Sequence, residues 1–226
     1  MNIKTKQFQI LTDINLVWNF MTDIYDPYFA NGAAAPFFEY ALTSKWMDKE
    51  YLHLNRLWMA GDIVVGFVFT EAVVTSVFFN LRPGYEGLAD EMVEYAQNSF
   101  PDLGGERELV IFSGQEALIR AAEKEGYKVS YENADFLFDF RKSGLSYDLP
   151  EGFHFVDPLK CDLLKLAKCT WNGFNAEELG PFKNWNIPDS ETPWNPHKAY
   201  TGVVNSAVAP PPHATHEYNV IIADEN

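Results

Sequence analysis

The sequence is short of cysteine and of long apolar runs. Its two cysteines, Cys161 and Cys169, stand about 12 Å apart along the axis of one predicted helix. That separation excludes a disulfide between them, and free thiols are typical of a reducing cytoplasm. The longest apolar stretches, such as residues 63–69, are too short to cross a bilayer, and residues 1–9 lack the apolar core of a signal peptide. We therefore expect a cytoplasmic protein.

Basic residues are also scarce. The 226 residues include 17 Lys and Arg against 32 Asp and Glu, a formal net charge of −15. Such a surface repels phosphate backbones and anionic lipids, so we expect neither nucleic acid nor a membrane as a partner. It attracts a cationic or amine-bearing substrate, although a high net charge also serves solubility alone.

Several chemical motifs are missing as well. The chain has no phosphate-binding P-loop, no dinucleotide fingerprint and no Ser-His-Asp or Cys-His motif. His213 and His216 have the His-x-x-His spacing but no further ligand cluster. We interpret them as part of a surface loop and expect no metal.

What is present is a regular alternation of strand and helix patterns. A short strand at residues 8–10 precedes a helix to Tyr25 with Asp13 as its predicted N-cap, and a second helix lies within residues 33–46. Strands follow at residues 51–59, 63–70 and 73–81, then a helix at 88–100 and a strand at 108–112. A helix from Gln115 ends at Gly126, and residues 134–140 alternate Phe136, Phe138 and Phe140 on one side of a last predicted strand.

These elements predict an α+β fold with a mixed sheet, in the order β-α-α-β-β-β-α-β-α-β over residues 1–142. Residues 143–150 are polar and predict a linker. The pattern then restarts, because a short strand at residues 153–156 again precedes an Asp and a helix. Residues 151–226 are thus expected to form the first part of a second copy, in a truncated chain. The alternative is a complete chain whose last strand docks on the first domain.

One local stretch supports a family resemblance. Residues 115–127 read QEALIRAAEKEGY, which is similar to the late helix N-x-x-A-x-x-L-Y-E-K-x-G-F/Y of the GNAT acetyltransferase superfamily. The predicted order of elements over residues 1–140 also resembles that family, and the incomplete repeat resembles tandem GNAT proteins. The resemblance implies a GNAT fold with acetyl-CoA as cosubstrate. A chance match on an unrelated α+β fold is the alternative.

The resemblance also implies a cofactor loop. In this family, acetyl-CoA binds where two parallel strands splay apart, and the loop R/Q-x-x-G-x-G/A holds the pyrophosphate with backbone amides. The matching segment is residues 80–92, and the implied cofactor contacts are Leu81, Arg82, Gly84, Tyr85, Gly87 and Leu88. The later glycines of the loop are missing, and Asp90 and Glu91 would repel a diphosphate at the helix start. Arg82 is either a phosphate contact or a surface residue.

The late helix departs from the family pattern too. Ala122 stands where the family has the tyrosine that protonates the leaving thiolate. The first domain is therefore expected to keep the fold without the chemistry, and no catalytic residue is assigned. If the protein is an enzyme, its cofactor loop is expected beyond Asn226.

The second copy offers candidate substrate residues. In the family, the first two helices and their loop line the acceptor side; here that region carries the aromatic and acidic candidates Trp171, Phe174, Glu177, Trp185 and Trp194. Aromatic faces and carboxylates suit an amine or ammonium group, either of a small molecule or of a peptide. The alternative, which is favoured for any single one of these residues, is ordinary packing of the aromatics and solvation of the carboxylates.

Two functions follow from these observations. The first is an acetyl-CoA-dependent N-acetyltransferase acting on an amine, as the resemblance implies. The second is a non-catalytic GNAT-like module for binding, gating or dimerisation, with a homodimer as a possible partner state.

Overall fold

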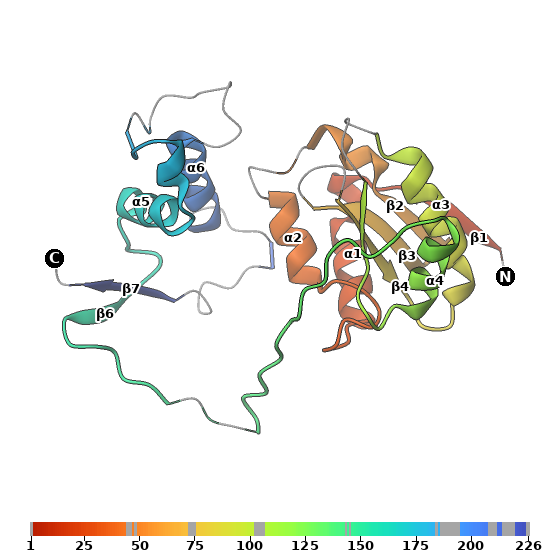
Figure 1. Cartoon of the computed structure of the whole chain (residues 1–226), viewed down its shortest axis with the longest axis horizontal. Helices are drawn as coiled ribbons and strands as arrows, with labels where there is room; N and C mark the ends of the chain where they lie inside the picture. Colours follow the sequence, from red (N-terminus) through yellow and green to blue (C-terminus); the bar gives the residue numbers. More distant parts are fainter. Residues whose placement is uncertain are drawn as a thin grey trace. The chain divides into compact units, whose positions relative to one another are not determined.

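The computed structural model describes most of the chain, namely residues 2–43, 47, 49–71, 76–101, 107–142, 144, 146–183, 185, 195–207, 212–213 and 220–224. The backbone divides into two compact units. Unit 1 comprises residues up to 42 and from 47 to 138, and unit 2 consists mainly of residues from 139 onward. Each unit is described by itself (Figure 1).

Unit 1 is a mixed α+β fold. Its elements in chain order are β1 (Ile3–Gln7), α1 (Ile10–Asp23), α2 (Ala35–Thr43), η1 (Lys49–Leu54), β2 (Arg56–Ala60), β3 (Ile63–Thr70), β4 (Ser76–Leu81), η2 (Glu86–Leu88), α3 (Ala89–Ser99), β5 (Glu108–Val110) and α4 (Glu116–Lys124).

The five strands form one sheet in chain order, β1-β2-β3-β4-β5. The first three pairings are antiparallel, and β4 pairs with β5 in parallel. The parallel pair has α3 as its crossover connection, as a parallel pair requires.

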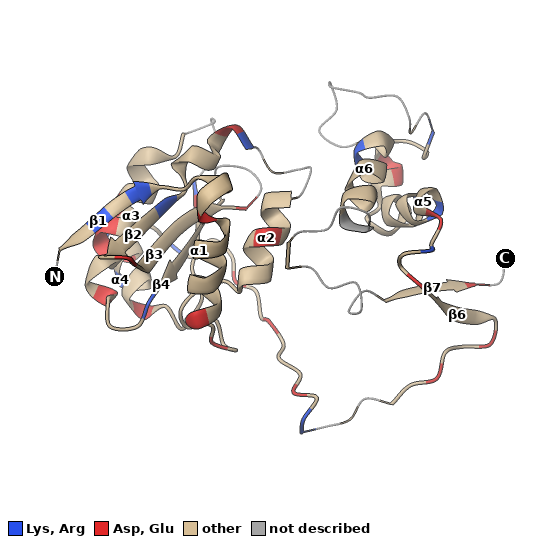
Figure 2. Cartoon of the chain, turned by 180° about the vertical axis from the view of Figure 1, so that it is seen from behind, with Lys and Arg blue, Asp and Glu red and all other residues tan. Residues whose placement is uncertain are grey.

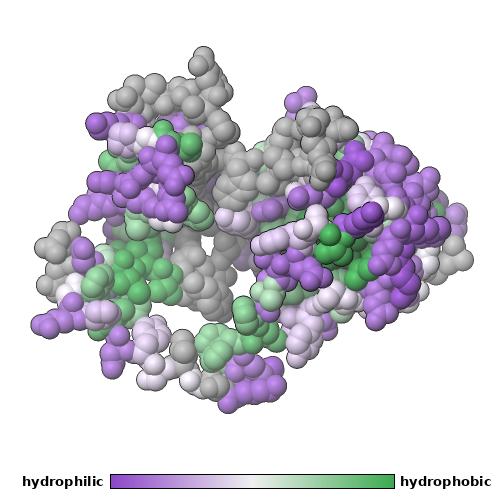
Figure 3. Space-filling view, viewed as in Figure 1, coloured by the Kyte–Doolittle hydropathy of each residue, from purple (hydrophilic) through white to green (hydrophobic). Residues whose placement is uncertain are grey.

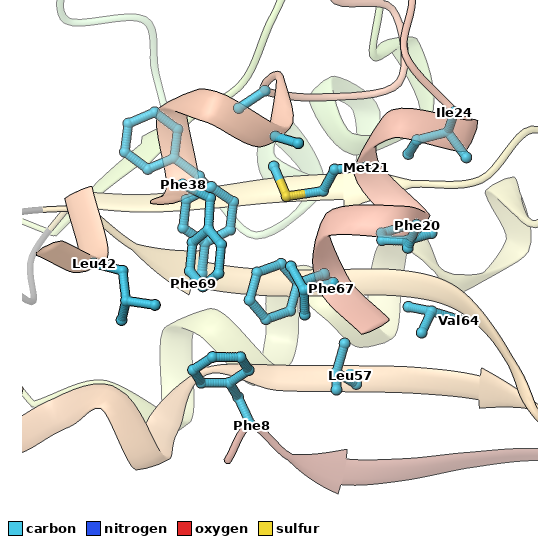
Figure 4. Close-up of a cluster of buried hydrophobic side chains, with 14 of the residues drawn as sticks. Phe8, Phe20, Met21, Ile24, Phe38, Leu42, Leu57, Val64, Phe67 and Phe69 are labelled. Atoms are coloured by element: carbon cyan, nitrogen blue, oxygen red, sulfur yellow. The ribbon is translucent and has the colours of Figure 1, made fainter. Parts of the chain in front are cut away.

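Helices cover both faces of this sheet (Figure 1). One face carries a cluster rich in phenylalanine: Phe38 from α2 and Phe67 from β3 meet edge to face with ring centroids 5.1 Å apart, and Phe67 stacks on Phe69 at 5.0 Å (Figure 4). Residues of α1, including Val17 and Met21, complete it. The opposite face packs Trp58, Val65, Val68 and Phe79 against α3 and α4.

The start of α1 corrects one expectation. Asp13 is not the N-cap, because the helix begins at Ile10 after an extended Gln9. The Asp13 carboxylate instead reaches back, accepting a hydrogen bond from the Gln9 N–H at 3.0 Å and pairing with Lys6 at 2.7 Å. From its place in the first turn of the helix, Asp13 therefore accepts a hydrogen bond from the amide of Gln9, just before the helix begins. The preceding strand is also earlier than predicted, at Ile3–Gln7.

The predicted last strand over residues 134–140 does not form. These residues have no regular secondary structure, and Phe136 is 96% exposed. The alternation of phenylalanines indicated a strand, but alternation only stabilises a strand that has a partner to pair with and a face to cover. The observed order in unit 1 thus ends at α4.

The end of α4 follows the sequence closely. Gly126 has φ +89°, its N–H donates to the Glu123 carbonyl at 3.0 Å, and the Tyr127 N–H donates to the Ala122 carbonyl at 3.0 Å. This is the Schellman pattern, which favours glycine because the left-handed region strains other residues.

Unit 2 contains β6 (Phe153–Val156), α5 (Leu163–Gly173), η3 (Ala176–Leu179), α6 (Pro196–Ala207) and β7 (Ile221–Asp224). Its two strands pair antiparallel, and Trp171, Ala176 and Ala199 form its small buried core with Phe182 packed against it. Phe153, Phe155 and Ile222 are about half exposed, which matches the hydrophobic surface over β6 and β7 in Figure 3.

Acidic side chains are distributed over the helices of unit 1 (Figure 2). Among the described residues, no helix combines the length and the apolar character needed to cross a membrane. Cys161 and Cys169 are both free.

Candidate functional site

The candidate site lies where β4 and β5 separate. Their parallel pairing joins Ser76–Phe78 to Glu108–Val110, while β4 runs on to Leu81. The carboxyl ends of neighbouring parallel strands are a common place for ligands in open sheets, because the chain leaves an opening there. This opening is the natural place to look for a cofactor in unit 1.

A buried glutamine bridges β4 and the segment after β5 at this point. The Gln115 amide nitrogen donates to the Phe79 carbonyl at 2.9 Å, and its oxygen accepts from the Phe112 N–H at 3.0 Å. Gln115 immediately precedes α4 and is almost fully buried. It therefore satisfies backbone groups that the diverging strands no longer satisfy for each other.

The loop between α1 and α2 occupies the rest of the opening. The Leu81 N–H donates to the Asn31 carbonyl at 3.0 Å, and the Asn80 side chain donates to the Ala33 carbonyl at 2.8 Å. Phe29 stacks on Phe112 with ring centroids 5.0 Å apart. The loop thus contacts both β4 and the segment after β5.

Two glycines allow this close approach. A Cβ atom at Gly32 would lie 2.4 Å from the Phe79 carbonyl oxygen, and one at Gly114 would lie 2.8 Å from the Ala30 Cα. Real Cβ atoms do not come so near to backbone. Both glycines are therefore needed for the packing and not only for a turn.

A hollow of about 250 Å³ remains beside the loop. It is lined by residues that include Leu81, Glu86, Gln115, Glu116 and Arg120. Ordinary small-molecule pockets measure roughly 300–1,000 Å³, so this one is small for a cofactor. Its two carboxylates also disfavour an anionic ligand.

Arg82, one of the predicted cofactor contacts, has other partners here. Its Nη1 pairs with the Asp23 carboxylate at 2.6 Å, its Nε donates to the Val64 carbonyl at 3.1 Å, and its guanidinium lies 5.6 Å from the Phe20 ring centroid. The side chain thus connects α1 to β3. This placement favours the structural interpretation of Arg82 over a phosphate contact.

In the glycine loop after β4, a backbone amide donates to a carboxylate of the same loop. The Gly84 N–H donates to the Glu86 carboxylate at 2.8 Å. Backbone hydrogen bonds, first from Gly84 and then from the Glu86 amide, hold the Glu86 pKa below its usual value. Tyr85, Gly87 and Leu88 line a shallow depression with Gly84 and Ile3. Of the predicted cofactor residues, Gly84 and Gly87 are exposed, Tyr85 and Leu88 are half-buried, and Leu81 is buried at the end of β4.

The acidic residues at the start of α3 also have partners within unit 1. Asp90 pairs with Lys124 of α4 at 2.6 Å, and Glu91 accepts from the Trp58 indole N–H at 2.8 Å. Both carboxylates lie in the first turn of α3, where they stabilise the helix dipole. A diphosphate at this helix start would meet negative charge.

Glu86 gives a pH-dependent prediction. Because its folded pKa is lowered, its contribution to stability is present above the ordinary glutamate pKa and is lost as the pH falls through the lowered value. Solvent screening keeps this contribution below about 1 kcal/mol. We expect Glu86→Gln to remove this part of the acid dependence of the free energy of unfolding, measured by urea titration between about pH 3 and pH 7. Glu123→Gln on α4 is the control, and an equal loss there would contradict the prediction.

The predicted substrate residues of unit 2 differ widely in their surroundings. Trp171 is buried, and its indole N–H donates to the Gly180 carbonyl at 3.1 Å. Phe174 is 80% exposed, and Glu177 lies exposed in η3. Trp185 packs against Tyr200 with ring centroids 4.5 Å apart. Trp194 lies outside the described residues.

Titratable residues elsewhere do not form a metal site in the described part of the chain, where no group of three or more His, Cys, Asp or Glu side chains could hold an ion. His213 lies in a turn, and His216 is outside the described residues.

Sequence reasoning missed Asn31 and Gly32, which lie in the opening, and Glu86, which bonds to the Gly84 amide. The Asn-Gly pair at 31–32 is a turn signal that could have marked the loop. Nothing in the sequence indicated that this loop would pack between β4 and the segment after β5, because the contact joins residues far apart along the chain.

Comparisons with known proteins do not assign the chain to a family. No protein-family model, no curated protein and no solved structure matches it.

Proposed function

We propose that this protein is a GNAT-type N-acetyltransferase, which transfers an acetyl group from acetyl-CoA to the amine of a small molecule or a peptide in the cytoplasm. The observation that carries this proposal is the sheet of unit 1, in which three antiparallel pairings are followed by one parallel pair that diverges at its carboxyl ends. The α4 sequence from Gln115 to Tyr127 adds the resemblance to the family's late helix.

The chemistry of such a transfer is direct attack of an amine on a thioester. A base takes the proton of the ammonium group, backbone amides stabilise the developing oxyanion, and an acid protonates the leaving thiolate. The net charge of −15 supports a cationic acceptor, because it raises the local concentration of ammonium groups.

Two observations favour a second candidate for unit 1 alone, a non-catalytic module for binding, gating or dimerisation. The Gly84 amide already has the Glu86 carboxylate as its acceptor. Ala122, at the position of the family's acid, is nearly buried and has no proton to donate. On this view unit 1 supports the fold of the protein and carries out no step of the transfer.

The test is an assay of the whole chain with acetyl-CoA and a panel of amines and peptides with free N-termini, following release of the coenzyme A thiol. Acetylated amine together with stoichiometric thiol supports the transferase. If neither transfer nor calorimetric binding of acetyl-CoA is found at millimolar ligand, the transferase proposal fails for this chain and the non-catalytic candidate stands.

A further inference from the structure

The opening between β4 and β5 contains backbone groups that a ligand would otherwise satisfy. Past the parallel pairing, the Leu81 N–H is bonded to the Asn31 carbonyl and the Phe79 carbonyl is bonded to the Gln115 side chain. An extended ligand with amide groups would use the same donor and acceptor. The chain's own loop therefore presents a peptide carbonyl where such a ligand would present one.

The loop is held in this position by its own hydrogen bonds. The Asp26 carboxylate accepts from the Tyr28 N–H at 2.9 Å and from the Ala30 N–H at 3.4 Å, and the Asn31 side chain donates to the Ile24 carbonyl at 2.8 Å. Phe29 has φ +56°, a left-handed conformation that is strained for a phenylalanine. Such strain persists only where surrounding contacts fix it, and here the stacking on Phe112 contributes to that.

Apart from the hollow of about 250 Å³ described above, the packing between the loop and the end of β4 leaves no space for a ligand. The Cβ positions of Gly32 and Gly114 are already within 3 Å of neighbouring atoms. A ligand chain along the end of β4 and the loop at residues 29–33 would thus occupy the same volume. They exclude each other sterically.

We propose that residues 29–33 are a built-in plug, which occupies the β4–β5 opening in place of an extended, amide-bearing ligand arm such as the pantetheine of coenzyme A. The choice of pantetheine rests on the proposed function, whereas the plug itself rests on the contacts above. Binding of that arm to unit 1 requires the plug to leave, so unit 1 is closed to coenzyme A in the state described.

The first experiment loosens the plug with one methyl group. Gly114→Ala places a Cβ against Ala30 without a positive φ at the substituted residue. We expect hydrogen exchange of the Leu81 amide to accelerate by about tenfold or more, while amides in the middle of β3 stay protected. Gly202→Ala in α6, where the added Cβ has no neighbour within 4 Å, is the control. Unchanged exchange at Leu81 in Gly114→Ala would contradict the plug.

The second experiment removes the plug. Residues 29–33 are replaced by a glycine-serine loop of the same length, with Glu86→Gln added to free the Gly84 amide, and folding is checked by a cooperative urea transition. Coenzyme A is then expected to protect the Leu81 amide in this variant and not in the wild type. If the variant unfolds, Gly114→Ala with Glu86→Gln is used, with a smaller protection expected.

The outcomes separate the plug from the proposed function. A folded variant that coenzyme A does not protect, or a wild type that coenzyme A protects equally, overturns the plug. Protection confined to the variant supports the plug even where the transfer assay finds no acetylated amine, in which case only the transferase proposal fails.

Discussion

Replacing Gly32 with alanine is expected to destabilise unit 1 by about 3 kcal/mol or more. Gly32 has φ +120°, which strains any residue with a Cβ, by about 1–3 kcal/mol. The new methyl group would also lie 2.4 Å from the Phe79 carbonyl oxygen, and overpacking of this kind costs about 1–3 kcal/mol. Relief by moving the loop would leave the Leu81 N–H without its acceptor.

The matched control is Gly61→Ala, in the turn between β2 and β3. Gly61 also has a positive φ, +64°, but an added Cβ there has no neighbour within 4 Å. The loss of stability in Gly61→Ala should therefore be limited to the strain of the positive φ, about 1–2 kcal/mol. Urea unfolding followed by tryptophan fluorescence measures both variants, and equal losses of stability would show that packing at Gly32 contributes nothing.

Replacing Phe67 with alanine is the second change with a large expected effect. Phe67 is fully buried at the centre of the cluster in Figure 4, where its ring meets Phe8, Phe38 and Phe69 with centroids 5.0–5.9 Å apart. Truncation removes the apolar contacts and leaves a cavity, so we expect a loss of about 3–5 kcal/mol in the free energy of unfolding.

Phe136→Ala is the control for this prediction, because the same truncation is made at a side chain that is 96% exposed. Its effect should stay within about 0.5 kcal/mol. Urea titrations of the two variants provide the comparison. A large loss at Phe136 would indicate that its side chain is buried in solution, contrary to the structure.

Much of unit 1 was predictable from local patterns. The strand at Ile63–Thr70 was predicted with its observed bounds, and α3, α4 and the Gly126 cap lie within a residue or two of their predicted positions. These elements combine strong propensity with a period of two or 3.6 and a clear stop signal. Both sides of β3 are buried, so the apolar run at Val64–Phe69 gave a reliable strand signal.

Asp13 shows where local reasoning was insufficient. An aspartate before an apolar stripe indicates an N-cap, yet the N-cap is Gln9, four residues earlier, and Asp13 stabilises the helix start from within the first turn. The sequence is compatible with both arrangements. A carboxylate can accept from amides that follow it in the chain, as an N-cap does, or from an amide that precedes it, as Asp13 does. The ion pair with Lys6 of β1 favours the observed choice.

By itself, the sequence determined β3, α3 and α4 of unit 1, the acidic composition and the weak cofactor loop, because each depends on residue type and short-range spacing. Only the tertiary structure decided that residues 29–33 fill the β4–β5 opening, that Glu86 takes the Gly84 amide and that residues 134–140 form no strand. Those outcomes depend on which backbone groups are left unsatisfied once distant segments meet, and no local pattern encodes that.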